Sequence, residues 1–599
     1  MFKRANKITS LLVAAASVMA LVPAYAADVK KVDSEDGTVY NAVAYKDGKF
    51  FVDGEINDDE EAYYVADGKF NKLDDVDSGD EANLFGEKYL DVSDGDYTVD
   101  LDKGSVTDDD VVGDTADDAA AALRKKIKDD TDDRYDEAQS DDIKKEENLT
   151  LIPGAKYGKV WYWTTYAATK NSDGTYKDAN DKAHEFNVFT DTEGNYIDAD
   201  YNLGKLKVTT TADGASGDKT VTIENTNDTY DTQSSTSKNI VGKDGLSASV
   251  EQKAVLTQDA DYIYRLVKVT VKTTNGAGIT EINDVKLADI KDKTVFTPDT
   301  NGSVNTVSFS AIQKISKAQN SDDVDGAKYA KTVTTYALSN DSGSKLDEES
   351  LFIDNNGAAV TTTKYTVANG KLIAYNTAND ANKKVTVDAY TLKTKGGYYY
   401  ADEEDKSSED CEVSAQDSNV AAVQTDVDGN LWRLDGGYIY KFDNTDDWDK
   451  VYKVDGSFDE LSVYDKDNMV AWSEDDDVYS LIGGKSDDNN GGETTTPVTT
   501  AGWTQTSAGW TYTKADGTKA TGWLQDGGAW YYLKADGTMA TGWVQDGATW
   551  YYLNGSGAMQ TGWLNDNGTW YYLNGSGAML ANTTTPDGYY VGANGAWVR

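Results

Sequence analysis

The chain has 599 residues, of which 57 are lysine or arginine and 104 are aspartate or glutamate, so its net charge is −47 at pH 7. A surface this acidic repels nucleic acid and anionic membranes, which bind through clustered lysine and arginine. The single cysteine, Cys411, has no partner for an internal disulfide and cannot form a cysteine metal cluster. Composition therefore excludes a nucleic-acid-binding protein and a disulfide scaffold, and we predict no cofactor.

The first 26 residues have the pattern of a secretory signal peptide. Lys3, Arg4 and Lys7 precede an apolar run over 8–22, and Ala24-Tyr25-Ala26 is typical of a cleavage site. The apolar run is too short for a membrane span, and no later segment approaches spanning length. We therefore predict a signal peptide over 1–26, a secreted protein and no transmembrane segment.

The acidic body that follows is predicted to be mainly β. In residues 27–148, strand-like runs at 38–45 and 50–52 flank Asp47-Gly48, a pair that tolerates the positive φ of a hairpin turn. Residues 114–147 are predicted to be a short helical insert, because Asp114 begins an alanine-rich segment that ends in basic residues. This first region is expected to combine β-hairpins with one helical interruption.

Two further β-rich regions and a linker complete the body. Residues 149–400 contain many β-branched runs separated by Asn, Asp and Gly, which predicts a β-sandwich-like region. Its strongest predicted strand is 262–272, where an apolar row on one face is broken only by Arg265. Residues 401–484 are predicted to form short aromatic strands, as in a meander or part of a propeller, and 485–501 is predicted to be a flexible linker.

No catalytic pattern stands out in the body. His184 is the single histidine, and neither G-x-S-x-G nor H-E-x-x-H surrounds it, so we interpret it as a surface or packing residue. Paired carboxylates for glycoside cleavage carry no weight among so many acids. Asp75 with Asp77, and Asp426 with Asp428, offer oxygen ligands, but both segments lack the glycine and glutamate of an EF-hand loop. We predict no enzyme activity and no metal site, with calcium in another oxygen-only geometry left open.

The last residues, 502–599, repeat one pattern four times. A Gly-Trp pair recurs every twenty residues from Gly502-Trp503 to Gly562-Trp563, and a second tryptophan follows each first one by seven residues. A fixed period near twenty is typical of a solenoid whose units pack only against their neighbours. We predict one β-hairpin for each unit, with turns at Gly527-Gly528, Asp546-Gly547 and Asn567-Gly568.

The aromatic side chains of these hairpins are predicted to form shallow ligand-binding boxes. Alternation along a strand puts Trp530 and Tyr532 on one face and Tyr531 on the other, so Tyr531, Tyr551 and Tyr571 are interpreted as mostly structural. Two tryptophans of one repeat, a tyrosine of the next and a methionine would attract a quaternary ammonium through their ring quadrupoles. The candidate ligand-binding residues are Trp503, Trp510, Trp523, Trp530, Tyr532, Met539, Trp543, Trp550, Tyr552, Met559, Trp563, Trp570, Tyr572 and Met579.

The unit over 521–540 resembles the cell-wall-binding repeat of choline-binding surface proteins from Gram-positive bacteria. The resemblance covers 502–599 alone and implies a β-hairpin solenoid that holds the choline of teichoic acids between successive hairpins. The first copy departs from the family pattern at Thr511 and Lys519, which predicts a capping unit with an impaired site. The last copy also departs, with Tyr589 and Trp597, and is interpreted as a closing cap.

The resemblance implies a secreted surface protein that is retained non-covalently on the cell wall. Its partner would be a cell-wall polymer, either choline-bearing teichoic acid or a glycan, and its acidic body would be displayed without catalytic activity. Two alternatives stay open. Similar repeats in other proteins bind glucan, whose C–H faces suit aromatic rings, and the same module often accompanies hydrolases of peptidoglycan or polysaccharide.

Overall fold

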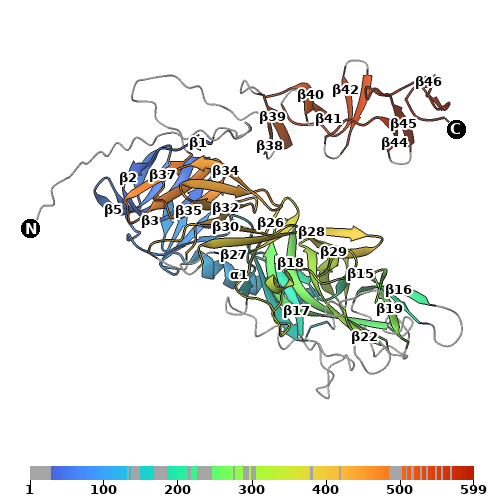
Figure 1. Cartoon of the computed structure of the whole chain (residues 1–599), viewed down its shortest axis with the longest axis horizontal. Coiled ribbons are helices and arrows are strands. Elements are labelled where there is room, and N and C mark those ends of the chain that lie inside the picture. Colours follow the sequence, from blue (N-terminus) through green and yellow to red (C-terminus); the bar gives the residue numbers. More distant parts are fainter. Residues whose placement is uncertain are drawn as a thin grey trace, which may run out of the picture. The chain divides into compact units, whose positions relative to one another are not determined.

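The structure is a computed structural model, and the parts of the chain that it describes are coloured in Figure 1. The predicted signal peptide, the predicted linker 485–501, His184 and most of 131–148 lie outside the described residues. The described residues are 29–130, 134–135, 149–154, 156–167, 185–211, 218–225, 246–273, 277–287, 296–298, 305–324, 326–377, 382–416, 420–483, 502–506, 509–514, 519–526, 529–534, 537–546, 549–554, 557–566 and 569–598.

The chain divides into two compact units, Met1–Asp487 and Asp488–Arg599. Strands dominate both units, and the described residues contain one α-helix, which lies in the first unit. The prediction of a mainly β chain with one short helical insert and C-terminal hairpins is confirmed.

Two four-stranded antiparallel sheets open the first unit and pack against each other through Phe51, Tyr64, Leu90 and Val99. Asp67 and Gly68, at the turn between β5 and β6, have φ of 51° and 72°, the left-handed conformation that an Asp-Gly hairpin turn needs. The sheets are β3 (Thr38–Tyr45), β4 (Lys49–Ile56), β5 (Asp59–Ala66) and β6 (Lys69–Lys72), then β7 (Ala82–Phe85), β8 (Tyr89–Val92), β9 (Tyr97–Asp100) and β10 (Ser105–Thr107).

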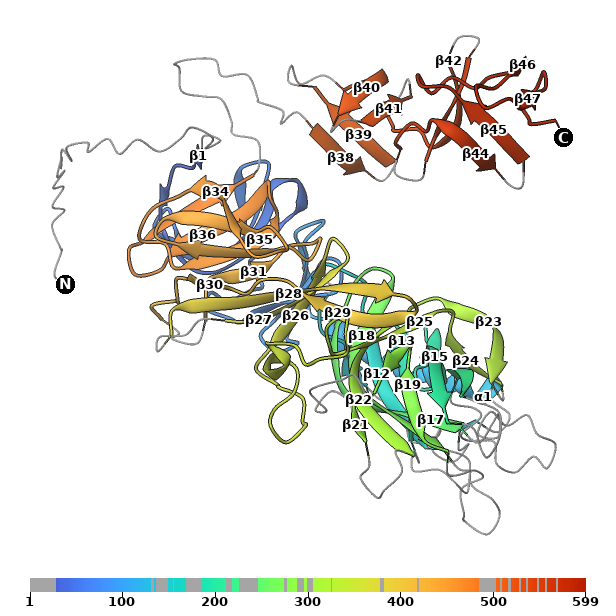
Figure 2. The same ribbon diagram turned by 45° about the vertical axis from the view of Figure 1, so that its right-hand side comes forward.

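The last part of the first unit completes this arrangement, as Figure 2 shows for β34, β35 and β36. Two short strands from the start of the chain, β1 (Lys30–Lys31) and β2 (Glu35–Asp36), pair with β34 and β37. Val470, Trp472 and Tyr479 share a core with β3–β5, so segments from both ends of the unit fold together. The strands are β31 (Val423–Thr425), β32 (Leu431–Asp435), β33 (Tyr438–Phe442), β34 (Trp448–Lys453), β35 (Glu460–Asp465), β36 (Asn468–Ser473) and β37 (Val478–Ile482).

A ten-stranded sheet forms the middle of the first unit. A second sheet packs on it through a core that includes Leu206, Val208, Val269 and Phe309, which is the sandwich-like packing that the sequence predicts. The large sheet contains β17 (Leu246–Gln258), β18 (Tyr262–Thr273), β21 (Thr297–Pro298), β22 (Thr306–Ser316), β25 (Val333–Ala337), β26 (Lys364–Ala368), β27 (Lys371–Asn376), β28 (Lys384–Lys395), β29 (Tyr398–Glu403) and β30 (Ser407–Asp410), and the second sheet contains β15 (Asn202–Thr210), β16 (Lys219–Asn225), β19 (Ile279–Ile282) and β20 (Val285–Lys286).

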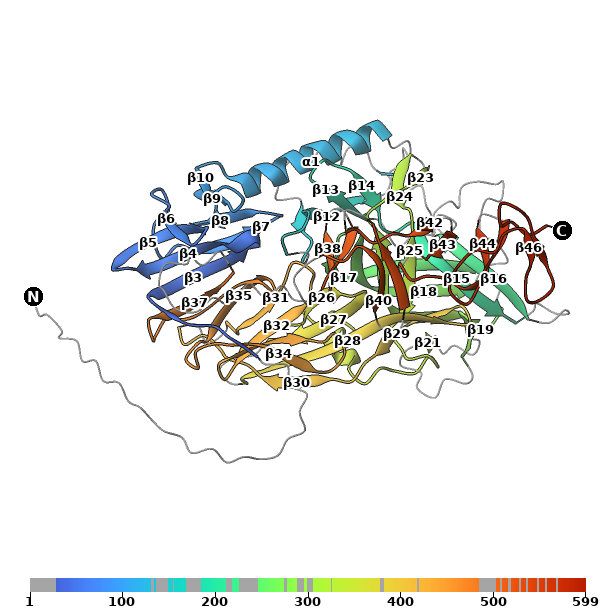
Figure 3. The same ribbon diagram turned by 90° about the horizontal axis from the view of Figure 1, so that it is seen from above.

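The single described helix, α1 (Val111–Asp130), covers a six-stranded sheet (Figure 3). Its buried face is Ala116, Ala119, Ala120, Leu123 and Ile127, at the three- and four-residue spacing of an amphipathic helix. The helix begins three residues before the predicted insert and ends at Asp130, and the described remainder of 114–147 is not helical. The sheet contains β11 (Thr150–Leu151), β12 (Trp161–Ala167), β13 (Glu185–Asp191), β14 (Tyr196–Asp198), β23 (Gln319–Val324) and β24 (Ala327–Ala330).

Arg265, which interrupts the apolar row of the predicted strand 262–272, is fully buried in β18. Its guanidinium donates to the Asp200 carboxylate at 2.9 Å, to the Gln313 side chain and to the Ala199 carbonyl. A buried cation is tolerated only when it is paired and hydrogen-bonded. The interruption is therefore an internal ion pair that joins β18 to the residues after β14.

We predict that Arg265→Ala destabilises the first unit by about 3–5 kcal/mol, because the Asp200 carboxylate loses its buried counter-charge. The matched control is Lys207→Ala, which removes a partly exposed pair with Asp284 at 2.5 Å and costs about 1 kcal/mol or less. Urea unfolding of each full-length variant measures the difference. Equal midpoints for the two variants would contradict the role given to Arg265.

Candidate aromatic cages in the C-terminal hairpins

Each of the four repeats forms one antiparallel β-hairpin, as the sequence predicts. The tips of the predicted turns lie outside the described residues. The strands are β38 (Gly502–Thr506) with β39 (Gly509–Thr513), β40 (Gly522–Asp526) with β41 (Ala529–Leu533), β42 (Gly542–Asp546) with β43 (Thr549–Leu553), and β44 (Gly562–Asp566) with β45 (Thr569–Leu573). A last short pair follows, β46 (Thr583–Thr584) with β47 (Tyr590–Val591).

The strand register divides each hairpin into two faces. In the second hairpin Trp523 lies opposite Tyr532 and Gln525 opposite Trp530, so both tryptophans and Tyr532 share one face. Leu524 lies opposite Tyr531 and points to the other face. Trp523 contacts both Trp530 and Tyr532, with ring centroids 6.5 and 5.1 Å apart.

The tyrosine that reaches a neighbouring repeat comes from this other face. The ring of Tyr531 lies 4.7 Å from that of Trp503, and Tyr551 lies 4.7 Å from Trp523. The same contact joins Tyr571 to Trp543 at 4.9 Å. Residues interpreted as mostly structural therefore close each cage, whereas Tyr532, Tyr552 and Tyr572 lie against the first tryptophan of their own hairpin. The tyrosine comes from the other face because hairpins stack in one direction. The face of one hairpin that carries the two tryptophans packs against the face of the next hairpin that carries Tyr551 or its equivalents.

A methionine of the next repeat lies beside the second tryptophan of each cage. The Met559 N–H donates to the Trp530 carbonyl at 2.8 Å, and a Cβ on Gly577 would meet the Met559 sulfur at 2.3 Å. The same bonds join Met539 to Trp510 and Met579 to Trp550. The cages that follow from these contacts are Trp503, Trp510, Tyr531 and Met539; Trp523, Trp530, Tyr551 and Met559; and Trp543, Trp550, Tyr571 and Met579.

The last hairpin forms a cage with the terminal segment. Trp563, Trp570, Asp587, Tyr589 and Trp597 line a cavity of about 340 Å³. Tyr589 takes the place of the cross-repeat tyrosine, 5.6 Å from Trp563, and the Trp597 N–H donates to the Trp570 carbonyl as a methionine does in the other repeats. The terminal segment, interpreted from the sequence as a closing cap, thus supplies two walls of an all-aromatic cage.

The departures of the first repeat from the pattern do not fall on the contacts that join it to the second repeat. Thr511 occupies the position of Tyr531, the tyrosine that serves the preceding hairpin. Likewise Lys519 occupies the position of Met539, which lies beside the tryptophan of the preceding repeat. Both departures would affect a cage before the first hairpin, and Trp503 keeps its contact with Tyr531 while Trp510 keeps its bond to Met539.

From the second repeat onward, the first tryptophan of each cage also binds a carboxylate that belongs to the following hairpin or, for the last cage, to the terminal segment. The indole N–H groups of Trp523, Trp543 and Trp563 donate to Asp546, Asp566 and Asp587 at 3.0, 2.9 and 2.7 Å. Hydrogen bonds from Thr585 and Trp563 hold the pKa of Asp587 below its usual range. Asp546 and Asp566 recur with the repeat period, but the sequence pattern alone did not predict that they bind the indoles.

The second tryptophan of each repeat stays open to solvent. Trp510, Trp530, Trp550 and Trp570 are 39–41% exposed, whereas Leu533, Leu553 and Leu573, each three residues after a tryptophan in the same strand, are at most 1% exposed. The leucines therefore supply the packing, and the tryptophans provide accessible ring surface of the kind that marks interaction sites.

In the first unit, Asp426 of the predicted oxygen-ligand segment and Asp198, which stands two residues before Asp200, bind protein donors. Asp198 accepts hydrogen bonds from Arg134 and Tyr135, both at 2.8 Å, and Asp426 accepts from Asn430 and Trp432 at 2.9 Å. Within the described residues, no group of three or more His, Cys, Asp or Glu side chains is placed to hold a metal ion. No helix in the same part of the chain is long and apolar enough to cross a membrane.

Protein-family models match the C-terminal hairpins. Choline-binding repeat models match residues 520–559 and 559–597, and through these hairpins the chain belongs to the choline-binding repeat proteins. Repeats of this family support attachment to a cell wall. Curated proteins give no match to the chain.

Several solved structures are similar to parts of the chain. The choline binding domain of a Streptococcus pneumoniae protein is 52% identical, with 13% of this chain and 96% of that one covered and a TM-score of 0.13. Choline binding protein F from the same organism is 21% identical over 51% and 98% of the two chains, with a TM-score of 0.16. The modular Cpl-1 endolysin, complexed with a peptidoglycan analogue, is 27% identical over 20% and 42%, with a TM-score of 0.14.

We predict that Gly577→Ala loosens the stack more than Gly562→Ala does. Both glycines have φ of +80°, so backbone strain is matched, but only at Gly577 does a new Cβ meet Met559, whereas it meets nothing at Gly562. Displacing a packed side chain costs about 1–3 kcal/mol. Urea unfolding followed by tryptophan fluorescence reports the stability of the hairpins. A Gly562→Ala effect as large as that of Gly577→Ala would contradict the inferred contact.

Proposed function

We propose that the chain is a secreted cell-surface protein retained on the wall by its repeats, which bind the choline of teichoic acids. The observation that carries this proposal is the repeated cage of two tryptophans, a cross-repeat tyrosine and a methionine or third tryptophan. Aromatic faces attract a quaternary ammonium through their quadrupoles, and such a cation has no N–H that would need a hydrogen-bond acceptor.

The carboxylates favour choline over glucan as the ligand. Asp546, Asp566 and Asp587 fix the indole rings of the preceding repeat and place a negative charge beside three of the cages. A carboxylate attracts a cation through its charge, whereas a neutral sugar can interact with it only by donating hydroxyl hydrogen bonds. Aromatic rings alone would serve either ligand, so these acids support the choline assignment.

Several weak cages on one chain would give firm retention. A single cation–π site contributes roughly 0.5–2 kcal/mol per ring, but each engaged cage raises the effective concentration of polymer for the next. The repeats would thus hold a polymer that carries many choline groups, while free choline would compete at each cage separately.

We propose that the first unit is displayed on the wall without hydrolytic activity. Two of its buried carboxylates are committed to internal hydrogen bonds, Asp198 to Arg134 and Tyr135 and Asp426 to Asn430 and Trp432. A catalytic acid or base needs a proton-transfer position next to substrate. These carboxylates serve the packing of the first unit.

We predict that free choline chloride releases the protein from choline-bearing cell walls, whereas sodium chloride of equal concentration and dextran do not. The salt control is required because the chain carries −47 and binds cationic surfaces by charge alone. Release by dextran, or equal release by both salts, would contradict the choline assignment.

Tyr589→Ala should lower the choline concentration needed for release, because Tyr589 lines the terminal cage. The neighbouring and equally exposed Tyr590 is the matched control, and Tyr590→Ala should leave release unchanged.

We predict that the purified chain leaves no cleared band in a zymogram cast with the same cell walls. A known wall hydrolase in a neighbouring lane shows that the walls are digestible. A cleared band at the position of this chain would favour a wall-tethered hydrolase instead.

A further inference from the structure

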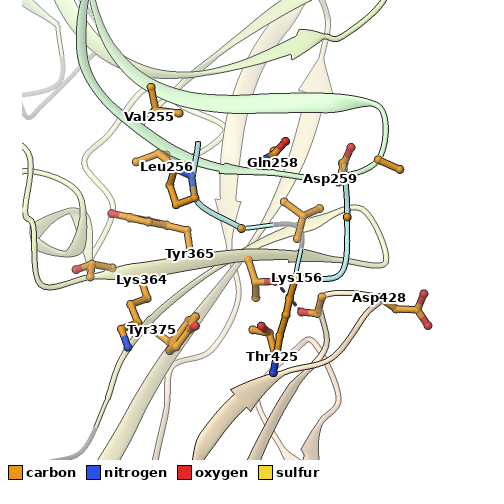
Figure 4. Close-up of a pocket in the computed structure, with 18 of the residues that line it drawn as sticks. Lys156, Val255, Leu256, Gln258, Asp259, Lys364, Tyr365, Tyr375, Thr425 and Asp428 are labelled. Atoms are coloured by element: carbon orange, nitrogen blue, oxygen red, sulfur yellow. Dashed lines mark hydrogen bonds between the residues drawn. The ribbon is translucent and has the colours of Figure 1, made fainter. Parts of the chain in front are cut away.

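A cleft in the first unit has the features of a second binding site. Its volume is about 1340 Å³, larger than the roughly 300–1,000 Å³ typical of small-molecule pockets. The walls come from residues 156–159, the end of β17 and the turn after it, residues 359–370 around β26, and the 425–429 turn between β31 and β32 (Figure 4). Segments distant in the sequence thus converge on one hollow.

The cleft concentrates cations in a strongly acidic chain. Five lysines and four acids line it, whereas the whole chain has 57 basic and 104 acidic residues. Lys156 donates to the Gln424 amide oxygen at 3.1 Å and to the Val463 carbonyl at 3.3 Å, and Lys317 donates to the Asp259 carbonyl at 2.6 Å. These ammonium groups therefore bind neutral oxygens, and burial lowers the pKa of each to about 8.

Two of the four lining acids, Asp259 and Asp426, accept hydrogen bonds from the protein, and Glu87 is exposed. The Asp426 carboxylate is held by Asn430 and Trp432, and that of Asp259 accepts from the Tyr262 N–H and the Tyr264 hydroxyl. Figure 4 shows the Asp428 side chain pointing away from the other labelled residues. The lysines thus determine the charge that a ligand in the cleft would meet.

The segment that carries Lys156 is held in place by the contacts of the next residue, Tyr157. The next residue, Tyr157, is buried, with its ring 4.7 Å from that of Tyr464 and 5.8 Å from that of Tyr45. Its hydroxyl donates to the Ala44 carbonyl. These contacts hold the segment on the core of the neighbouring sheets, so the ammonium position is set before any ligand arrives.

The other walls of the cleft contain tyrosine rings and a buried amide oxygen that accepts no hydrogen bond. Gln258 is 4% exposed, and its amide nitrogen donates to the Ile152 carbonyl, but its amide oxygen has no hydrogen-bond partner. Tyr365 and Tyr375 lie on the paired strands β26 and β27 and both line the cleft, but from opposite faces of the pair, because Lys364 is directly opposite Tyr375. A buried acceptor without a donor is unfavourable, so this wall suits a ligand with hydroxyl groups.

We propose that this cleft binds an acidic saccharide, a sugar chain that carries a carboxylate or phosphate group. Its oxyanion would be held by Lys156 or Lys317, a C–H face would pack on Tyr365 or Tyr375, and a hydroxyl would donate to Gln258. The size of the cleft fits more than one sugar ring. This site is independent of the aromatic cages and gives the first unit a ligand of its own.

The test is calorimetric titration of the full-length protein, with excess choline present to occupy the repeats. The probes are glucose 6-phosphate, glucuronic acid, neutral glucose and inorganic phosphate. We expect one or both acidic sugars to bind and to bind more tightly than glucose and inorganic phosphate; the two acidic probes distinguish phosphate from carboxylate. Lys156→Gln keeps a hydrogen-bond donor without the charge and should weaken binding by about tenfold.

Lys364→Gln, at an exposed position of the cleft, should also weaken binding, and it keeps the test valid if Lys156→Gln fails to fold. The matched control is Lys272→Gln, an exposed lysine of β18 outside the cleft, which should change affinity less than twofold. Absence of binding to either acidic sugar would overturn the proposal. So would equal binding of glucose or inorganic phosphate, or affinities that none of the cleft variants changes.

Discussion

An aromatic cage in this protein is completed only by the next hairpin along the chain. One face of each hairpin presents two tryptophans, and the opposite face of its successor supplies the tyrosine that closes the cage, as Tyr551 does for Trp523. The contact that packs two hairpins together is therefore also the contact that completes a cage. One hairpin alone has no complete cage. The same constraint explains the two ends. Thr511 has no preceding tryptophan to cover, and Tyr589 with Trp597 covers the last pair.

The carboxylates connect the stability of the stack with its ligand preference. An indole N–H that donates to Asp566 is held in one orientation, and the same bond joins consecutive hairpins. The charge then remains beside the cage, where it attracts a cation. The repeats carry few other charges, while the first unit carries most of the acidity of the chain. The attraction for a cation in the repeats thus comes from individual placed acids, not from a general negative field.

Local patterns in the sequence were sufficient to predict the hairpins, the mainly β body and the existence of a helical insert. Alternation along a strand correctly put Trp530 and Tyr532 on one face, but it contains no information about which face the next hairpin presents. For this reason the cross-repeat role of Tyr531, and the acids bonded to the indoles, required the structure. Long-range pairing was also unpredictable, since nothing local indicates that β1 and β2 join β34 and β37 or that Arg265 meets Asp200.

The central claim is that each of the four hairpins forms one cage with the segment that follows it. Calorimetric titration of the intact protein with choline tests this claim most directly, because it counts sites. The account predicts four sites on the intact chain and three after Tyr589→Ala. Fewer than four sites on the intact chain, or an unchanged count in the variant, would contradict it.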